Sequence, residues 1–270
     1  SCIYTQYNMD LYVSPDGSDK NNGTNESQPF KTLKRALSML YTTSFSPNGI
    51  HLAAGTYSEA ATDETFPLYL RNYVTISGPE TWDAIIDTDG EDLFSLLDGL
   101  NAITIENLEV NNPRSGLYTQ DSEITLNNTE FTGIYQPYID CIQAEGGSLY
   151  LNNVSIKGFR KGILSDGTYL NLHDCEISEN RNGISTSGGS IYIYDTEICS
   201  NSPGGGIHAH SYSYIRIYDS YISGNGSDRG GGIYCSGESS LRLYSTSICQ
   251  NEASEMGGGI YLNNSYVTFY

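Results

Sequence analysis

The sequence predicts an all-β protein that winds as a single-stranded parallel β-helix with three strands in each coil. The first observation is a repeat that begins near residue 101, in units of 21 to 26 residues. Each unit starts at an apolar residue, and these are Ile103, Ile124, Leu149, Leu170, Ile191, Ile215, Leu241 and Val267. Apolar or small residues recur two, five and seven positions later, which predicts two short strands that share an inward face and are separated by a bend.

A third strand in each unit is the second observation, and a Gly-Ile pair or a close variant marks it. The pairs begin at Gly116, Gly162, Gly183, Gly206, Gly232 and Gly259. A leucine-rich horseshoe would need an LxxLxL consensus, and a β-propeller of this size would need longer antiparallel blades. The units show neither pattern, so the three strands of one unit form one coil.

A column of asparagines is the third observation. Asn180, Asn201, Asn225 and Asn251 each stand ten positions after the first apolar residue of their unit, although unit length varies. An asparagine at a repeated corner can bond both the turn and its own copy in the next coil, about 4.8 Å away. We therefore expect these four residues to form an interior ladder.

The chain before residue 101 differs from the regular coils and divides into two parts. Residues 1–49 predict a strand, a polar loop and an amphipathic helix of about three turns, because Phe30, Leu33, Leu37 and Leu40 fall on one helical stripe. A β-helix has an open apolar end, so capping that end is the expected role of the helix. Residues 50–100 then predict irregular first coils, and residues 101–270 the regular ones.

The sequence stops within the first strand of a further coil, at Val267 to Tyr270. An open apolar end favours stacking or aggregation. We therefore expect a fragment of a longer protein, truncated at its C-terminal side. Self-association through the uncapped end is the alternative.

Charge and composition exclude several classes of function. The chain of 270 residues has 32 acidic and 13 basic side chains, a formal net charge of −19. Such a polyanion repels phosphate backbones, so a nucleic-acid partner is not expected. The chain has no apolar run long enough to span a membrane. Six cysteines show no zinc-binding spacing, and Cys2, after a small serine, suggests the lipid-bearing residue of a bacterial lipoprotein.

A family resemblance rests on motifs spread over nearly the whole chain. YVSPDGSD, QPFKTLKRAL and HLAAGTYSE resemble the start module, of unknown function, of secreted bacterial pectin-lyase-like, right-handed β-helix proteins. ISGNGSDRGGGIY and ICQNEASEMGGGIY resemble coil motifs of polymorphic outer-membrane proteins and autotransporter passengers. The resemblance implies a right-handed coil, as parallel crossovers generally have, and a bacterial protein that is secreted or at the cell surface. These folds carry adhesins, lyases, hydrolases and structural proteins alike, so activity does not follow.

Ranks of outward carboxylates are the first candidate site. Asp174 and Asp195 stand four positions into their units, and Glu176 and Glu197 stand six positions in. Three hypotheses compete: a solvated acidic face, a calcium site at these four residues, and a catalytic pair at Asp174 and Glu176. Carboxylates one coil apart repel by only about 1 kcal/mol in water, so the face needs no function to be tolerated.

The resemblance also implies catalytic sequence motifs that enzymes of this family have, and most of these motifs are missing here. Polygalacturonases have an adjacent Asp-Asp pair and a Gly-His-Gly, whereas this chain has no Asp-Asp and reads Gly-Ile-His208-Ala-His210. His208 and His210 flank an inward alanine and are expected on the surface. Lyases of this fold use a basic group, for which Arg160, Lys161 and Arg181 at a corner are the candidates.

Tyrosine ranks are the second candidate site. Tyr194, Tyr218 and Tyr244 recur at one outward position in successive coils, and Tyr234 and Tyr261 follow the Gly-Ile motifs. One hypothesis is cross-strand stacking that stabilises the sheet. The other is a flat aromatic face for sugar rings or a partner protein.

Together these observations favour a non-catalytic extracellular or cell-surface β-helix protein, acting in adhesion or as a structural component. A polysaccharide or another surface protein is the expected partner. No cofactor is expected, with calcium as the alternative. The competing function is a polysaccharide lyase or glycoside hydrolase, which would use Asp174, Glu176, Arg160 and Arg181.

Overall fold

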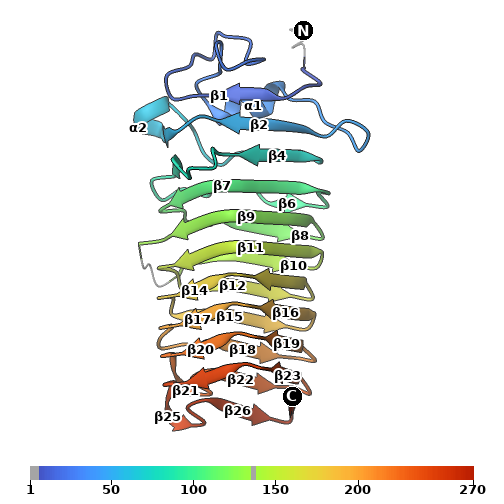
Figure 1. The fold of residues 1–270 in the computed structure, drawn as a ribbon, viewed down its shortest axis with the longest axis vertical. Helices are drawn as coiled ribbons and strands as arrows, with labels where there is room; N and C mark the ends of the chain where they lie inside the picture. Colours follow the sequence, from blue (N-terminus) through green and yellow to red (C-terminus); the bar gives the residue numbers. More distant parts are fainter. Residues whose placement is uncertain (1–5, 135–137) are drawn as a thin grey trace.

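The structure is a computed structural model and describes residues 6–134 and 138–270. Cys2, the suggested lipid-bearing residue, lies outside these ranges. Coils stack along one axis with the N-terminal segment at one end, and neighbouring coils lie side by side along the whole length (Figure 1). All pairings between named strands are parallel, as in the ladders of Ile103 with Ile124 and of Leu149 with Leu170. The predicted parallel β-helix is therefore confirmed.

Two sets of strands build the regular coils. The first set contains β7 (Ile103–Asn111), β9 (Glu123–Thr132), β11 (Ser148–Lys157), β13 (Tyr169–His173), β14 (Glu176–Ser178), β16 (Ser190–Tyr194), β17 (Glu197–Cys199), β19 (Tyr214–Tyr218), β20 (Tyr221–Ser223), β23 (Ser240–Tyr244), β24 (Ser247–Cys249) and β27 (Tyr266–Phe269). The second set is an eight-stranded sheet of β6 (Leu97–Asp98), β8 (Leu117–Gln120), β10 (Asp140–Glu145), β12 (Lys161–Asp166), β15 (Asn182–Ser187), β18 (Ile207–His210), β22 (Ile233–Ser236) and β26 (Ile260–Asn263). A small separate pair, β21 (Gly226–Arg229) and β25 (Glu252–Met256), lies beside the last coils (Figure 1).

The core is a column of side chains in which each coil packs on copies of itself. In one coil Leu170, Leu172, Cys175 and Ile177 are at most 3% exposed, and these are the positions that the repeat predicts to face inward. In β7, β9 and β11 the strand continues through the predicted bend, whereas in later coils it is interrupted there. Burying a few apolar residues per coil is sufficient because each coil covers the next.

The four asparagines lie at one interior corner. Asn180 donates from its backbone N–H and from Nδ2 to Oδ1 of Asn201, at 3.0 and 3.2 Å. Asn201 makes the same two contacts to Asn225, and Asn225 makes them to Asn251. The amide of each also donates to a backbone carbonyl of the preceding coil, as Asn201 does to Ile177. The first three are at most 1% exposed, so this ladder satisfies polar groups that burial would otherwise leave unpaired.

The N-terminal segment forms the end of the stack. It contains β1 (Leu11–Val13), α1 (Leu33–Met39), β2 (Asn48–Leu52), β3 (Gly55–Tyr57), α2 (Glu59–Thr62), β4 (Val74–Ser77) and β5 (Ala84–Asp87). Helix α1 is shorter than the expected three turns. It begins after Thr32, whose side chain accepts from the N–H of Arg35, and ends where Leu40 becomes extended. Phe30 pairs with Val13 before the helix starts.

A buried carboxylate completes the start of α1. Glu64, 1% exposed, accepts from the N–H groups of Leu33 and Lys34 at 2.6 and 3.1 Å. Burial raises the pKa of Glu64, although these hydrogen bonds oppose the shift. Leu33, Ala36 and Leu37 are buried, and α1 packs beside β1 and β2 at the end of the stack (Figure 1). Among the described residues, neither helix is long and apolar enough to cross a membrane.

Candidate functional site

A groove along the bend between the first two strands of each coil brings together the four carboxylates singled out in the sequence. We call it the corner groove, and its volume is about 490 Å³. It is lined by Trp82, Asn153, Val154, Ser155, Asp174, Cys175, Glu176, Asp195, Thr196, Glu197, Asp219 and Tyr221. Its polar residues therefore come from four successive coils, with aromatic side chains from β20 and from the loop before β5.

The backbone explains why aspartates follow this bend. Asp174, Asp195 and Asp219 have φ angles of 53°, 47° and 47°, in the left-handed region. Asparagine and aspartate enter that region more readily than other residues with a side chain. The same position in the earlier coils holds Asn128 and Asn153, and Nδ2 of Asn153 donates to Oδ1 of Asn128 at 3.0 Å. The column is thus an amide ladder that changes to carboxylates at Asp174.

An exposed histidine lies between two of these carboxylates. Nδ1 of His173 is 2.8 Å from Oδ2 of Asp174, and Nε2 is 3.7 Å from Oδ2 of Asp195. One ligand atom from each residue lies within 4.8 Å of the others, and no other such triple occurs in the described part of the chain. The closest donors are thus a nitrogen and two oxygens, which suit a transition metal better than calcium. Glu176 instead accepts from the hydroxyl of Ser178.

The tyrosine rank is a closed stack, the geometry of the first of the two hypotheses. Tyr194 and Tyr218 lie 4.8 Å apart between ring centroids, and the next two pairs, Tyr218 with Tyr244 and Tyr244 with Tyr270, lie 4.4 Å apart. Their planes differ by only 6° to 7°. Each inner ring therefore has both faces covered by its neighbours. A sugar would meet ring edges and hydroxyls there, while stacking stabilises the sheet.

Tyr234 and Tyr261 belong to a different surface. They lie on β22 and β26 of the eight-stranded sheet, with ring centroids 5.6 Å apart, whereas the stack lies on β16, β19 and β23. The five tyrosines named in the sequence thus do not form one face, because strands of one coil belong to different sheets. Tyr221 and Trp82, absent from the expected sites, have no ring partner within the described ranges.

The candidate catalytic set is divided between separate places. Asp174 and Glu176 line the corner groove, but Arg160 lines another cavity of about 430 Å³ and forms an ion pair with Asp140. Arg181 follows β14 in the next coil, where its N–H donates to the carbonyl of Phe159. Neither arginine lines the corner groove. The basic and acidic candidates therefore do not act as one site in this geometry.

Lys161, His208 and His210 lie on the eight-stranded sheet. Burial lowers the pKa of Lys161, and it lowers the pKa of His208 to about 4. Both histidines point outward from β18, as expected, but they help to line a cavity together with Arg229 and Glu255 from β21 and β25. Nε2 of His208 is buried with no hydrogen-bond partner among the described residues. The repeat could not reveal this cover, because β21 and β25 lie outside the three-strand pattern.

Comparison with known proteins gives two family matches. Residues 15–85 match a family described as a protein of unknown function, DUF1565, and residues 161–270 match the right-handed β-helix region. An uncharacterized protein of Bacillus subtilis (strain 168), YwoF, is 31% identical over 140 residues. The match covers 46% of this chain and 29% of that protein, so the chain corresponds to under a third of its relative's length.

Solved structures of the same fold are similar over most of the chain. Pectate lyase Pel9A has a TM-score of 0.63 at 14% identity, covering 99% of this chain and 80% of that one. XylC in complex with xylose has a TM-score of 0.55 at 9% identity, covering 90% of this chain and 76% of that one. A rhamnogalacturonan lyase has a TM-score of 0.50 at 12% identity, covering 88% of this chain and 73% of that one. At such identities the likeness establishes the fold alone. The chain thus has the right-handed parallel β-helix fold that pectate lyase Pel9A also has.

Proposed function

We propose that the protein is an extracellular, non-catalytic β-helix that adheres to a linear polysaccharide through the corner groove. The supporting observation is that Trp82 and Tyr221, whose rings have no ring partner in the described residues, lie in one groove with polar side chains from four coils. Free aromatic faces pack against the apolar faces of sugar rings. Carboxylates and the amide of Asn153 can bind sugar hydroxyls.

Charge narrows the class of polysaccharide. Five groove residues are acidic, and the whole chain has a net charge of −19. An anionic polymer is repelled by such a surface, whereas a neutral or cationic polymer is not. Xylose in the XylC complex and the names of the two lyases show that proteins of this fold handle carbohydrates, which also supports the proposal.

Trp82 provides the test, because it is the only tryptophan in the chain and lies in the groove. A fluorescence titration with soluble xylan, chitosan and polygalacturonate should shift or quench its emission with the first or second polymer and not with the third. Replacing Tyr221 with alanine should weaken binding about tenfold, in line with roughly 1–1.5 kcal/mol for an aromatic contact.

Two controls separate the groove from the general surface. Asp195→Asn keeps a residue that accepts the left-handed backbone and removes one groove charge, and Asp166→Asn removes the same charge on the exposed end of β12. Only Asp195→Asn should change the affinity for the polymer. Unchanged Trp82 emission with a panel of neutral and cationic polymers, or cleavage of a polymer that one carboxylate substitution abolishes, would refute non-catalytic adhesion.

A polysaccharide lyase is the second candidate, favoured by one observation on the other sheet. Lys161 has a lowered pKa because of burial, and Arg160 and Asp140 lie beside it. A lysine that releases its proton more easily can abstract one from a sugar carbon. This hypothesis predicts unsaturated products, detected by ultraviolet absorbance, whose formation Lys161→Met abolishes while Asp174→Asn leaves it intact.

Calcium remains a separate proposal for the corner groove, where it would bind the carboxylate oxygens alone, whereas the triple that includes His173 suits a transition metal. A bound cation would remove repulsion between Asp174 and Asp195, so added calcium should raise the melting temperature and a chelator should reverse the rise. The double variant Asp174→Asn/Asp195→Asn should not respond. A melting temperature that ignores calcium and chelator in the wild-type protein rejects this proposal.

A further inference from the structure

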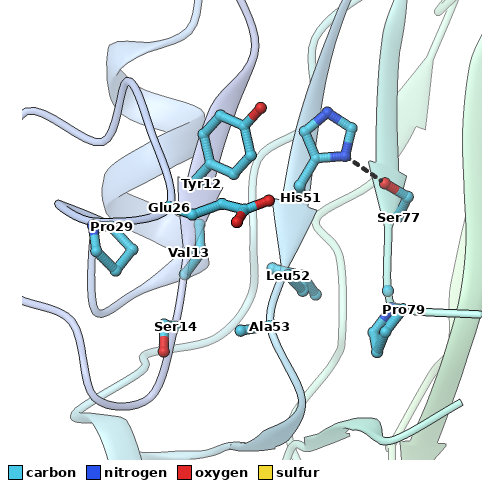
Figure 2. A pocket seen from close by; sticks show the side chains of 11 residues that line it. Tyr12, Val13, Ser14, Glu26, Pro29, His51, Leu52, Ala53, Ser77 and Pro79 are labelled. Carbon is cyan, nitrogen blue, oxygen red and sulfur yellow. Dashed lines mark hydrogen bonds between the residues drawn. The ribbon is translucent and has the colours of Figure 1, made fainter. Parts of the chain in front are cut away.

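A further cavity, remote in sequence from the corner-groove acids, lies in the N-terminal segment. Its volume is about 520 Å³, and it opens between the loop after β1 and the outer faces of β1, β2 and β4. Figure 2 shows the side chains around it: Tyr12 and His51 at one end, with Pro29 and Pro79 on opposite sides. We call it the N-terminal pocket. Ligand cavities in proteins commonly have about this size.

The polar end of the N-terminal pocket is fixed by neighbouring strands. Tyr12, His51 and Ser77 are register partners on β1, β2 and β4. Nδ1 of His51 is 2.9 Å from the hydroxyl of Ser77, and Nε2 is 3.4 Å from Oδ2 of Asp10. The Tyr12 ring packs against the imidazole with centroids 5.2 Å apart. His51 is thus held from both ring nitrogens, which gives the pocket a defined polar edge before any ligand arrives.

Glu26 gives the pocket a negative charge. Its side chain is exposed on the loop, and its carboxylate extends across the pocket toward the side of His51 (Figure 2). Glu26 has no hydrogen bond or ion pair with any residue in the described ranges. Asp10 adds a second carboxylate behind His51. A cationic group on a ligand would therefore find a free partner here, and an anionic group would be repelled.

We propose that the N-terminal pocket binds a pyranose ring with a free amino group, that is, an amino sugar. The apolar face of the sugar packs against Tyr12 and the proline rings. One of its hydroxyls bonds to the hydroxyl of Ser77, which His51 holds in place, and its ammonium pairs with Glu26. A simple hydrophobic ligand would leave the Glu26 carboxylate without a partner, at a cost in affinity. This site is independent of the proposed adhesion through the corner groove.

The experiment is an NMR titration of the protein with glucosamine, glucose and glucuronate. Glucosamine should bind about threefold to fivefold more tightly than glucose, the range of one exposed ion pair. Glucuronate should bind at least about tenfold more weakly than glucosamine, because it meets two carboxylates. Equal affinity for glucosamine and glucuronate, or no detectable glucosamine binding, would overturn the proposal.

Variants place the binding in this pocket. Glu26→Gln should bring glucosamine to the affinity of glucose, and Glu80→Gln, which removes an exposed acid that does not line the pocket, should change nothing. Tyr12→Leu should weaken all three sugars. Because Glu26 is exposed on a loop, its variant should fold even if the Tyr12 variant does not. The NMR signals of Tyr12 and His51 report glucosamine at this pocket alone, and signals of Trp82 and Tyr221 report the corner groove, so this site and the proposed adhesion can fail separately.

Discussion

At the scale of single residues, backbone conformation rather than chemistry accounts for much of the acidic rank. Asp174, Asp195 and Asp219 occupy a left-handed position that every regular coil repeats. Evolution can place asparagine, aspartate or glycine there at low conformational cost. An aspartate column is therefore compatible with a purely structural origin. Function has to be argued from what surrounds it, such as Trp82 and Tyr221.

The first prediction separates conformation from charge at Asp195. Asp195→Asn should change the free energy of unfolding by less than about 0.5 kcal/mol, because asparagine accepts the left-handed backbone. Asp195→Ala should lower it by about 1 kcal/mol or more, the cost of that conformation for an ordinary residue. Urea denaturation of both variants provides the measurement. Equal losses would show that the carboxylate, and not the backbone, matters at this bend.

The second prediction concerns acid stability and His208. Its pKa falls from 6.5 in the unfolded chain to about 4 in the fold, because burial disfavours the charged ring. Between these values the unfolded chain binds a proton that the fold rejects. The contribution to stability is thus complete above pH 6.5 and is lost as pH falls toward 4, by at most roughly 3 kcal/mol.

His208→Phe should flatten this part of the stability curve, since it keeps a ring against Tyr234 and removes the titrating group. Denaturation at several pH values between 7 and 4 measures the difference in the free energy of unfolding between the variant and the wild-type protein. The titration of carboxylates, which both proteins share, cancels in this difference. The exposed His173 replaced by glutamine serves as the comparison. An identical slope in wild type and His208→Phe would show that burial of His208 has no effect on acid stability.

At the scale of elements, the sequence allows prediction of whatever the coils repeat. Inward positions such as Leu170 and Leu172 recur because each must be buried against its copies, and Asn201 recurs because one buried corner has the same unpaired groups in every coil. Register then follows, since a slip by one residue would turn apolar side chains outward.

Features that do not repeat could not be predicted in the same way. Trp82 and Glu26 come from irregular loops, so no periodicity places them beside the groove or the pocket. The tyrosine rank left two hypotheses open for another reason. Sequence spacing shows that Tyr218 faces outward, but side-chain rotamers decide whether its ring face is free or covered by Tyr194 and Tyr244.

The third prediction tests the asparagine ladder as an element. Asn201→Ala removes the acceptor for two donors of Asn180, and also the donor to the carbonyl of Ile177. These groups are buried, so unfolding should become easier by about 2–4 kcal/mol. Asn152→Ala removes one hydrogen bond, to Asn127, on the exposed face and should cost under about 1 kcal/mol. Similar melting temperatures for the two variants would contradict a structural role for the ladder.

At the scale of the whole molecule, stability is distributed along one axis. Each coil contacts only its neighbours, so a change at one end should weaken the adjacent coils before distant ones. Helix α1 and the segment around it cover the N-terminal end, and the outward charge of −19 keeps the sides of the stack hydrated. The stack thus depends on its end as well as on the regularity of its coils.

The last prediction uses Glu64 to test how far a defect at this end propagates. Glu64→Ala leaves the buried N–H of Leu33 and the partly buried N–H of Lys34 without an acceptor, so α1 should loosen at a cost of about 1–3 kcal/mol. Hydrogen exchange should then accelerate in β1 and β2 and stay unchanged in β19, five coils or more away. Glu64→Gln, which can still accept one bond, should show a smaller effect. Burial raises the pKa of Glu64, so the folded chain holds this proton more tightly than the unfolded chain does. The resulting contribution to the stability of the fold is complete at acid pH and is lost as the pH rises through the raised pKa, a trend that Glu64→Gln should remove. Uniform acceleration from β1 to β19 would mean that the protein opens as one cooperative unit instead of fraying from the N-terminal end.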